Sequence, residues 1–335
     1  MAAKIVECRR CINTTVNPEV HINEDGLCDI CELYLFGLNE SRLRDELRFF
    51  KTLPDRSKKW DAMVGLSGGK DSSATLHLTQ SLGFRPLAFT FDIGYYPEHE
   101  FERAARIAEA SGVDYARIRI GEYMHESDRT SYRKTAELYE RAPSVDLKRV
   151  FLETLVEDKL HNSPRCNHAR AFVRTCRLCR HTVIRAYYHE ALKRKVSLVI
   201  LGMNEYAELR SSRGGKPLVS AMRTLNPYDR AQVHIVHLPF LMRRTAEATR
   251  KTLEEIGWTK PPGEDFVESN ANSCLFARSA EAFARRMLGF HPDTKRLARE
   301  VTVGYLTKDQ ARRALEHVHR SKESVREILE RAKIL

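Results

Sequence analysis

The chain lacks any long hydrophobic run, and its first eight residues lack the apolar core of a secretion signal. A membrane-spanning helix needs about 20 consecutive apolar residues. We therefore expect a cytoplasmic protein that makes no contact with a membrane. An internal repeat and a low-complexity tract are also absent, so the 335 residues are expected to form two or three globular domains.

Acidic side chains are fewer than basic ones, 45 against 56, which gives a net charge of +11. The excess is spread along the chain, and arginines are most frequent in 165–194 and 278–299. A surface of this kind could attract RNA or an anionic small substrate. A highly charged surface is also typical of thermophilic proteins, so charge alone does not decide between these interpretations.

A glycine turn separates an apolar run at 63–66 from a helix-like stretch at 74–80. The six residues of this turn are Ser67, Gly68, Gly69, Lys70, Asp71 and Ser72. Glycines let a phosphate approach the backbone, and successive N–H groups at a helix start attract an anion. Because Lys70 adds a full positive charge, the turn is predicted to hold phosphate groups.

The hexapeptide is not a Walker loop, which has four residues between its first glycine and its Gly-Lys pair. It matches the SGGxDS signature and so resembles the PP-loop ATP pyrophosphatases. Members of that superfamily cleave ATP between the α- and β-phosphates and adenylylate an oxygen, and a nitrogen or sulfur nucleophile then displaces AMP. The resemblance implies that 67–72 bind ATP with Mg²⁺. The alternative is a glycine-rich strand–helix turn that arose by chance.

Strand-like and helix-like segments alternate around and after this turn. Predicted strands are 61–66, 85–92, 115–120, 197–202 and 234–239, and predicted helices include 98–110, 182–194 and 245–257. Such alternation indicates an α/β fold with a doubly wound parallel sheet, and the resemblance implies that this sheet is of the PP-loop (HUP-like) type. The expected regions are a Cys-rich head at 1–38, an ATP pyrophosphatase domain at 39–260 with a helical insertion at about 125–160, and a helical C-terminal region at 261–335.

Two CxxC pairs lie near the start of the chain with 16 residues between them: Cys8 and Cys11, then Cys28 and Cys31. Cysteines of a cytoplasmic protein serve as metal ligands more often than as disulfides. Four thiolates at this spacing form a tetrahedral zinc site, typically a structural one. So short a segment would hardly fold without a metal. We therefore predict a zinc-ribbon-like head, with iron or free thiols as the alternatives.

Four more cysteines follow the predicted ATP loop. Cys176 and Cys179 form a third CxxC pair before a basic helix, Cys274 lies beyond the last α/β element, and Cys166 is a further candidate. Three cysteines can ligate three irons of a [4Fe–4S] cluster and leave the fourth iron open to a sulfide. A redox disulfide, a second zinc site, a catalytic persulfide and inert thiols are the competing interpretations.

The order of these motifs over roughly 1–275 is similar to that of the iron–sulfur tRNA 2-thiolation enzymes of the PP-loop superfamily. The resemblance implies that Cys176, Cys179 and Cys274 ligate a [4Fe–4S] cluster. Those enzymes tend to have Gly-His-Asn before acidic residues at a later strand, where this chain has Asn204 and Glu205. These two residues are predicted to replace part of that catalytic set. Another departure is that no cysteine follows Cys274 to form a C-terminal zinc module.

A second resemblance involves both ends of the chain. The head up to Cys28 and the segment Val303 to Ala311 look like parts of the N-acetyl sugar amidotransferases, which are PP-loop proteins that use ammonia from a glutaminase partner. Those enzymes usually have Val in place of Lys70, and a third CxxC pair is not expected in them. The chain therefore combines features of both branches.

Further polar residues are candidates because of their positions. Asp71 is expected to orient the loop, to bind Mg²⁺ or to cap the following helix. Asp92 ends a strand at the carboxyl edge, where ligands bind in such sheets, and is a candidate for contact with ribose or Mg²⁺. Arg180, His181 and Arg185 could contact pyrophosphate or a substrate phosphate, although a solvated basic helix face is the alternative.

Two enzymatic functions follow from these features. In the first, Lys70 and the loop amides neutralise the departing pyrophosphate, and the cluster passes sulfur to an adenylylated carbonyl carbon, expected in tRNA. The sulfur donor would be a protein or sulfide. The second is an amidotransferase or related ligase that acts on a sugar nucleotide or other small metabolite with a glutaminase subunit. A homodimer is expected. A protein that binds RNA without catalysis is the least favoured interpretation.

Overall fold

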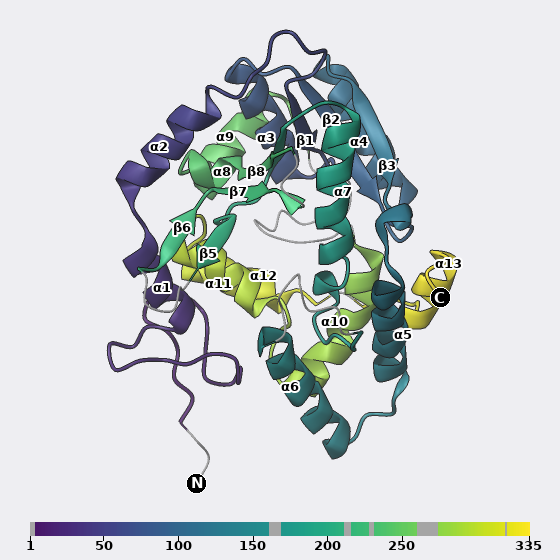
Figure 1. The fold of residues 1–335 in the computed structure, drawn as a ribbon. Helices are drawn as coiled ribbons and strands as arrows, with labels where there is room; N and C mark the ends of the chain where they lie inside the picture. The colour runs from purple at the N-terminus through teal and green to yellow at the C-terminus, as the bar shows by residue number, and fades with distance from the viewer. Residues whose placement is uncertain (1–3, 161–168, 211–215, 228–230, 260–273, 319) are drawn as a thin grey trace.

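The computed structural model describes residues 4–160, 169–210, 216–227, 231–259, 274–318 and 320–335. The strands of the main sheet are β1 (Ala62–Gly65), β2 (Pro86–Asp92), β3 (Tyr115–Arg119), β4 (Leu198–Leu201), β7 (Met222–Leu225) and β8 (Val233–His237). Their order in space is β3-β2-β1-β4-β8-β7 (Figure 1). All neighbours are parallel except β7, which pairs antiparallel with β8 at one edge. The predicted α/β fold with a parallel sheet is confirmed.

The strand order reverses between β1 and β4. From β1 the chain winds outward through β2 to β3, and it returns to the other side of β1 with β4 and then β8. Ligands of doubly wound sheets bind at such a reversal, beyond the carboxyl ends of the strands. The SGGKDS turn begins two residues after β1 ends at Gly65. The sheet therefore places this turn at the position where a ligand is expected.

Helices cover both faces of the sheet. The helices of this part are α2 (Glu40–Phe50), α3 (Lys70–Ser81), α4 (Glu98–Ala110), α7 (Arg180–Lys193), α8 (Leu238–Leu241) and α9 (Ala246–Glu255). Successive residues of β1 point to opposite faces, and Val64 joins Leu76 of α3 and Ala104 of α4 in one buried cluster. Met63 joins Ala186 of α7 in another cluster. The sheet is thus the middle of three layers.

The sequence analysis did not predict three short strands. They are β5 (Glu208–Arg210) and β6 (Leu218–Ser220), which form a hairpin, and β7. Each has three or four residues and little apolar periodicity, so neither pattern nor length marks it. Because β7 covers β8, the strand predicted at 234–239 lies inside the sheet, and it ends at His237, where α8 begins.

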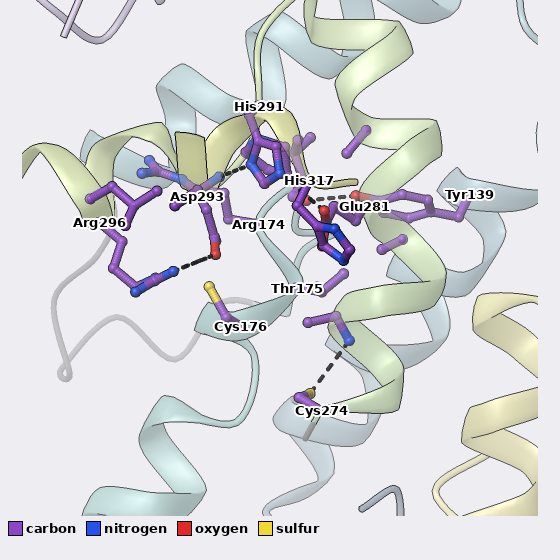
Figure 2. A pocket seen from close by; sticks show the side chains of 17 residues that line it. Tyr139, Arg174, Thr175, Cys176, Cys274, Glu281, His291, Asp293, Arg296 and His317 are labelled. Atoms are coloured by element: carbon purple, nitrogen blue, oxygen red, sulfur yellow. Dashed lines mark hydrogen bonds and ion pairs between the residues drawn. The ribbon is translucent and has the colours of Figure 1, made fainter. Parts of the chain in front are cut away.

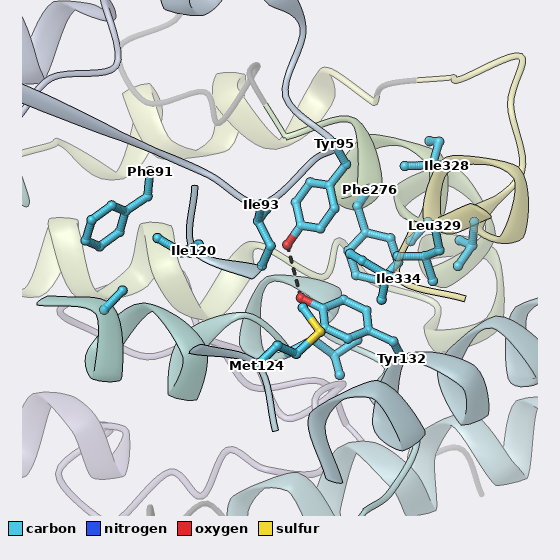
Figure 3. Close-up of a cluster of buried hydrophobic side chains, with 14 of the residues drawn as sticks. Phe91, Ile93, Tyr95, Ile120, Met124, Tyr132, Phe276, Ile328, Leu329 and Ile334 are labelled. Carbon is cyan, nitrogen blue, oxygen red and sulfur yellow. Dashed lines mark hydrogen bonds between the residues drawn. The ribbon is translucent and has the colours of Figure 1, made fainter. Parts of the chain in front are cut away.

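The polar segment predicted as an insertion forms α5 (Glu126–Glu140) and α6 (Val145–Leu160). The C-terminal helices are α10 (Leu275–Leu288), α11 (Thr294–Thr302), α12 (Lys308–Glu316) and α13 (Val325–Arg331), and two 3₁₀ turns are η1 (Gly121–Tyr123) and η2 (Thr175–Arg177). Helix α6 packs on α10, and α5 packs on α13. Their shared core contains Tyr95, Tyr132 and Phe276, and the two tyrosine hydroxyls lie 3.2 Å apart (Figure 3). The predicted domain limits stay predictions, and the one at 260–261 lies outside the described residues.

The N-terminal head packs against the other end of the chain. Helix α1 (Asp29–Gly37) follows Cys28. All four head cysteines belong to one buried cluster with Leu297 and Val301 of α11 and Ala311 of α12. None of the helices that the structure describes is both long and apolar enough to cross a bilayer.

Gly202 offers a test of the packing between β4 and α3. A Cβ atom there would lie 2.9 Å from the carbonyl oxygen of Asp71 and 3.0 Å from Oγ1 of Thr75. We expect Gly202→Ala to lower the free energy of unfolding by about 1–3 kcal/mol, measured by urea denaturation. Gly121→Ala is the matched control, because a Cβ atom there meets nothing within 4 Å and the backbone has no positive φ. Equal stability of the two variants would contradict the close approach.

Candidate functional site

The glycine turn after β1 is held by its own serines. Oγ of Ser72 accepts from the N–H of Ser67 at 3.1 Å and donates to the carbonyl of Gly69 at 3.0 Å. Gly68 has φ +75°, a conformation that favours glycine, and a Cβ atom there would come within 3.2 Å of the backbone nitrogen of Ala104. Helix α3 begins at Lys70 with Gly69 as its N-cap. A rigid turn at a helix N-terminus is suited to binding a phosphate.

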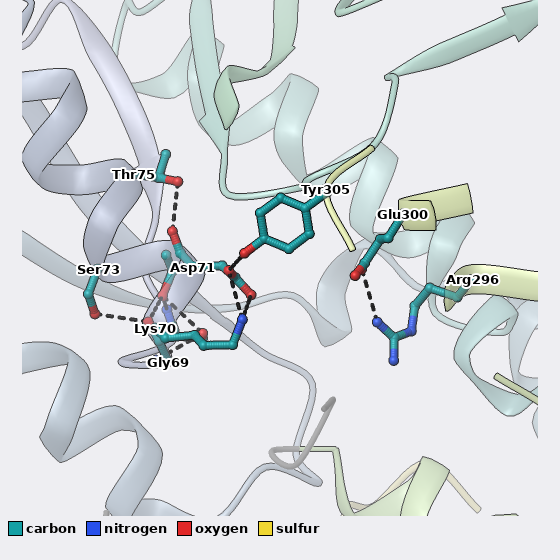
Figure 4. A network of polar contacts seen from close by, with 10 residues as sticks. Gly69, Lys70, Asp71, Ser73, Thr75, Arg296, Glu300 and Tyr305 are labelled. Carbon is teal, nitrogen blue, oxygen red and sulfur yellow. Dashed lines mark hydrogen bonds and ion pairs between the residues drawn. The ribbon is translucent and has the colours of Figure 1, made fainter. Parts of the chain in front are cut away.

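Lys70 and Asp71, the charged residues of the turn, contact each other, and Asp71 also contacts a tyrosine of the C-terminal region. Nζ of Lys70 lies 3.1 Å and 3.2 Å from the two carboxylate oxygens of Asp71. The hydroxyl of Tyr305, which follows α11, donates to Oδ1 of Asp71 at 2.8 Å (Figure 4). Nothing in the sequence marked Tyr305 as part of this site, although it lies in the C-terminal segment of the amidotransferase resemblance. A residue of the helical tail therefore contacts the predicted ATP loop.

Asn204 and Glu205 lie at the same edge of the sheet, in the segment after β4. Both are buried, and Oδ1 of Asn204 has no hydrogen-bond partner among the described residues. Oε2 of Glu205 lies 2.7 Å from Nε of Arg299 on α11. The backbone carbonyl oxygen of Glu205 lies 2.8 Å from Nδ1 of His237. Since an unpaired buried amide oxygen is costly, Asn204 is the group of this pair that best suits a ligand.

Asp92 has partners of its own at the end of β2. Nε of Arg117 donates to its Oδ2 at 2.8 Å, and the N–H of Gly94 donates to its Oδ1 at 2.9 Å. Arg117 also pairs with Glu98 at 2.5 Å. These contacts give Asp92 a role in the turn after the strand, and its contact with ribose or Mg²⁺ stays a prediction.

Arginines from two helices, α7 and α11, lie near Glu205. Desolvation and the nearby charges of Arg223 on β7 and Arg299 lower the pKa of Arg180, the first residue of α7. Arg296 on α11 is close enough to influence the pKa of Glu205 as well. Arg185, by contrast, pairs with Asp128 and donates to the carbonyl of Tyr123. Positive charge at the carboxyl edge of a sheet favours an anionic ligand.

The four cysteines of the head converge on one point. The Sγ atoms of Cys8, Cys11, Cys28 and Cys31 all lie within 4.8 Å of one another, and all four side chains are buried. The N–H of Cys28 donates to Sγ of Cys8 at 3.2 Å, and the N–H of Asn13 donates to Sγ of Cys11 at 3.5 Å. Four thiols in contact with one another and with amide donors form a site that can bind a metal such as zinc or an iron–sulfur centre.

The four thiols of this group do not all ionise together. Hydrogen bonds from Cys11, Cys28 and Cys31 lower the pKa of Cys8. Hydrogen bonds to Cys28, Cys31 and Cys8 raise the pKa of Cys11. Hydrogen bonds from Cys11 and Cys31 also lower the pKa of Cys28 to about 7, so two thiolates are stabilised while Cys11 and Cys31 stay protonated. A bound cation would allow all four to ionise, because metal ligation favours the thiolate.

The third CxxC pair and the distal cysteine lie in one region. Cys176 and Cys274 line a cavity of about 110 Å³ that also contains Arg174, Asp293 and Arg296 (Figure 2). Within the described residues, only the head cysteines form a compact group of potential metal ligands. A [4Fe–4S] site formed by Cys176, Cys179 and Cys274 therefore stays a prediction, and Cys166 lies outside the described residues.

The surroundings of Cys179 and Cys274 are aromatic and apolar. Burial first, and then the charge of Cys176, raises the pKa of Cys179 to about 11. Burial and the charge of Cys179 raise the pKa of Cys274 to about 12. Both cysteines pack against the cluster that contains Tyr95 and Tyr132. Without a metal or another cation, these thiols stay protonated and unreactive at neutral pH.

Comparisons with known proteins give an overall likeness without an activity. No family model matches this chain. Over 331 residues it is 23% identical to an uncharacterized protein of Methanocaldococcus jannaschii, a match that covers 97% of this chain and 99% of the relative. The parallel sheet and the four-cysteine group fit a PP-loop fold. The chemistry of the site must therefore carry any functional argument.

Metal content tests the head directly. We expect about one zinc ion per chain in the purified protein, bound by the four thiolates of the head. Cys28→Ser should lose this metal. It should also lower the free energy of unfolding by about 4 kcal/mol or more, since the packing of the buried residues of the head depends on the metal. Cys176→Ser, which leaves the head intact, is the control and should keep the zinc. Elemental analysis and denaturation measure both effects, and an unchanged metal content in Cys28→Ser would contradict the assignment.

Glu205 predicts a dependence of stability on pH. Burial raises the pKa of its carboxyl to about 7, and the opposing charge of Arg299 only partly offsets this. The folded state therefore binds more protons than the unfolded state above the ordinary pKa of glutamate, about 4.3. The resulting stabilisation, about 3 kcal/mol, is complete below that pH and is lost as pH rises through about 7.

Glu205→Gln cannot ionise and should show a flatter stability profile between about pH 5 and 8. Urea denaturation at several pH values measures the profile. Glu254→Gln, on the exposed surface of α9, should keep the wild-type slope. The same slope in all three proteins would show that Glu205 does not titrate in this range.

Proposed function

We propose that this protein is an ATP-dependent enzyme that adenylylates a carbonyl oxygen and replaces that oxygen with sulfur. ATP and Mg²⁺ would bind at 67–72, with Lys70 and the loop amides facing the phosphates. The observation that carries the sulfur assignment is the common location of Cys176, Cys179 and Cys274. Cys176 and Cys179 are both close enough to Cys274 to raise its pKa, although about 95 residues separate Cys179 from Cys274 along the chain.

Charge and burial make this region suitable for an iron–sulfur cluster. A [4Fe–4S] cluster is held by thiolates, and apolar surroundings and local charges set its potential. The aromatic cluster with Tyr95, Tyr132 and Phe276 would supply the apolar wall. Arg174 and Arg296 line the same cavity as Cys176 and are held there by ion pairs with Glu19 and Asp293. When bound, the cluster would supply an iron with an open coordination position that can carry sulfide.

The residues of this chain would divide the remaining work. The arginines around Glu205 are suited to hold an anionic acceptor beside the ATP loop. The free Oδ1 of Asn204 could accept a hydrogen bond from that acceptor. Adenylylation at the loop makes the oxygen a good leaving group, because AMP departs with it. The acceptor that we propose first is a tRNA base, in line with the surplus positive charge of the chain.

The second candidate is an amidotransferase or related ligase that acts on a sugar nucleotide, with ammonia from a glutaminase subunit. The contact between the head and 303–311 favours it, because the two segments that resemble such enzymes lie together. Tyr305, from the second of these segments, also contacts Asp71 of the loop at 2.8 Å. In that case the cysteines near the cavity would be structural thiols.

Iron content separates the two candidates. We expect anaerobically purified protein to be brown and to contain about four irons per chain in addition to the metal of the head. Cys176→Ala, Cys179→Ala and Cys274→Ala should each lose most of this iron while the head metal stays. Cys166→Ala should keep it, because three ligands suffice for the proposed cluster. A colourless protein, or iron that persists in all three variants, would favour the amidotransferase.

A further inference from the structure

Tyr305 limits how Asp71 can be used. Its hydroxyl donates to Oδ1 at 2.8 Å, and Tyr305 is only 3% exposed. Burial and the charge of Asp71 raise the pKa of Tyr305, so the hydroxyl stays protonated and remains a donor at neutral pH. Lys70 contacts both carboxylate oxygens. Oδ2 therefore has one donor where Oδ1 has two, which makes Oδ2 the oxygen more available to a cation.

The metal-binding head holds the segment that carries Tyr305 from both sides. Arg10, between the first two cysteines of the head, donates to the carbonyl of Thr302 at 3.1 Å and 2.8 Å. Nζ of Lys308 donates to the carbonyl of Cys8 at 2.7 Å. Sγ of Cys31 also lies 3.1 Å from Oγ1 of Thr302. The three contacts lie within three residues of Tyr305 in the sequence.

We propose that Tyr305 is a positioning residue of the ATP loop and that the metal-bound head keeps it in place. Tyr305 would fix the carboxylate of Asp71 so that Oδ2 can ligate the Mg²⁺ that accompanies ATP, because Mg²⁺ tolerates little deviation from ideal geometry. The four-cysteine group would act on nucleotide binding through 302–308, without touching the nucleotide. This inference rests on the proposed ATP binding at 67–72 and adds the Mg²⁺ ligand and its support.

Tyr305→Phe tests the contact with the smallest possible change. Binding of the non-hydrolysable analogue α,β-methylene-ATP to the full chain is measured by calorimetry, once with Mg²⁺ and once with a chelator of Mg²⁺. We expect about tenfold weaker binding with Mg²⁺, the order of magnitude of one lost hydrogen bond to a charged group. Binding without Mg²⁺ should stay within about twofold of the wild type, since Asp71 then has no cation to ligate.

Tyr188→Phe is the matched control. Tyr188, on α7, is also buried. Its hydroxyl donates to the backbone carbonyl of Ala231 at 3.2 Å. This variant should bind the analogue as the wild type does under both conditions. If Tyr305→Phe weakens binding equally with and without Mg²⁺, its role is structural only and the inference is wrong.

The role of the head is tested by Arg10→Met, which keeps the long side chain but removes the bonds to Thr302. Arg10→Met should reproduce the Mg²⁺-dependent loss in the wild-type background. It should add little in the Tyr305→Phe background, because both changes act on one contact and their effects are not additive. Additive losses would overturn the link between head and loop.

The outcomes also separate this inference from the function on which it rests. If the wild type does not bind the analogue at all, the proposed ATP site is wrong and the inference is wrong with it. If the wild type binds with Mg²⁺ and Tyr305→Phe binds equally well, the inference alone is overturned.

Discussion

Parallel pairing of the central strands is the constraint on which the rest of the structure depends. Because β1, β4 and β8 run in one direction, their carboxyl ends lie at one edge of the sheet. The SGGKDS turn, Asn204 with Glu205, and the start of α7 all lie at this edge, although they are far apart in the sequence. The sheet thus gathers the candidate site, and the helices decide which side chains face it.

Buried ion pairs connect the head to both parts of that site. Glu19, in the head, lies 2.5 Å from Arg174, two residues before Cys176, and 3.5 Å from Lys295 on α11. A buried carboxylate without its partner is strongly destabilising, whereas a complete pair is close to neutral. Such pairs favour one docked arrangement of head, α11 and η2 over looser ones. The head is therefore part of the framework that positions the cysteines and the loop.

The sequence predicted the parts of this structure that depend on local patterns. Apolar runs predicted the parallel strands. The spacing of the head cysteines predicted that they lie together, and the glycine turn predicted a helix N-terminus, which the structure has at Lys70. The sequence did not predict the contacts between distant segments. Neither Tyr305 nor Arg299 has a local signal, because each acquires its role only when α11 packs beside the sheet. Edge strand β7 was missed since a strand covered on one side needs few apolar residues.

The packing of the head on α11 and α12 has a consequence for how the chain is made. The head is synthesised well before its partners near 297–314. Contacts over almost 300 residues are slow to form, and apolar surface that waits for them promotes aggregation. Early capture of a metal by the four cysteines would keep the head folded during this interval. The same ion would thus protect the nascent chain before it supports the finished site.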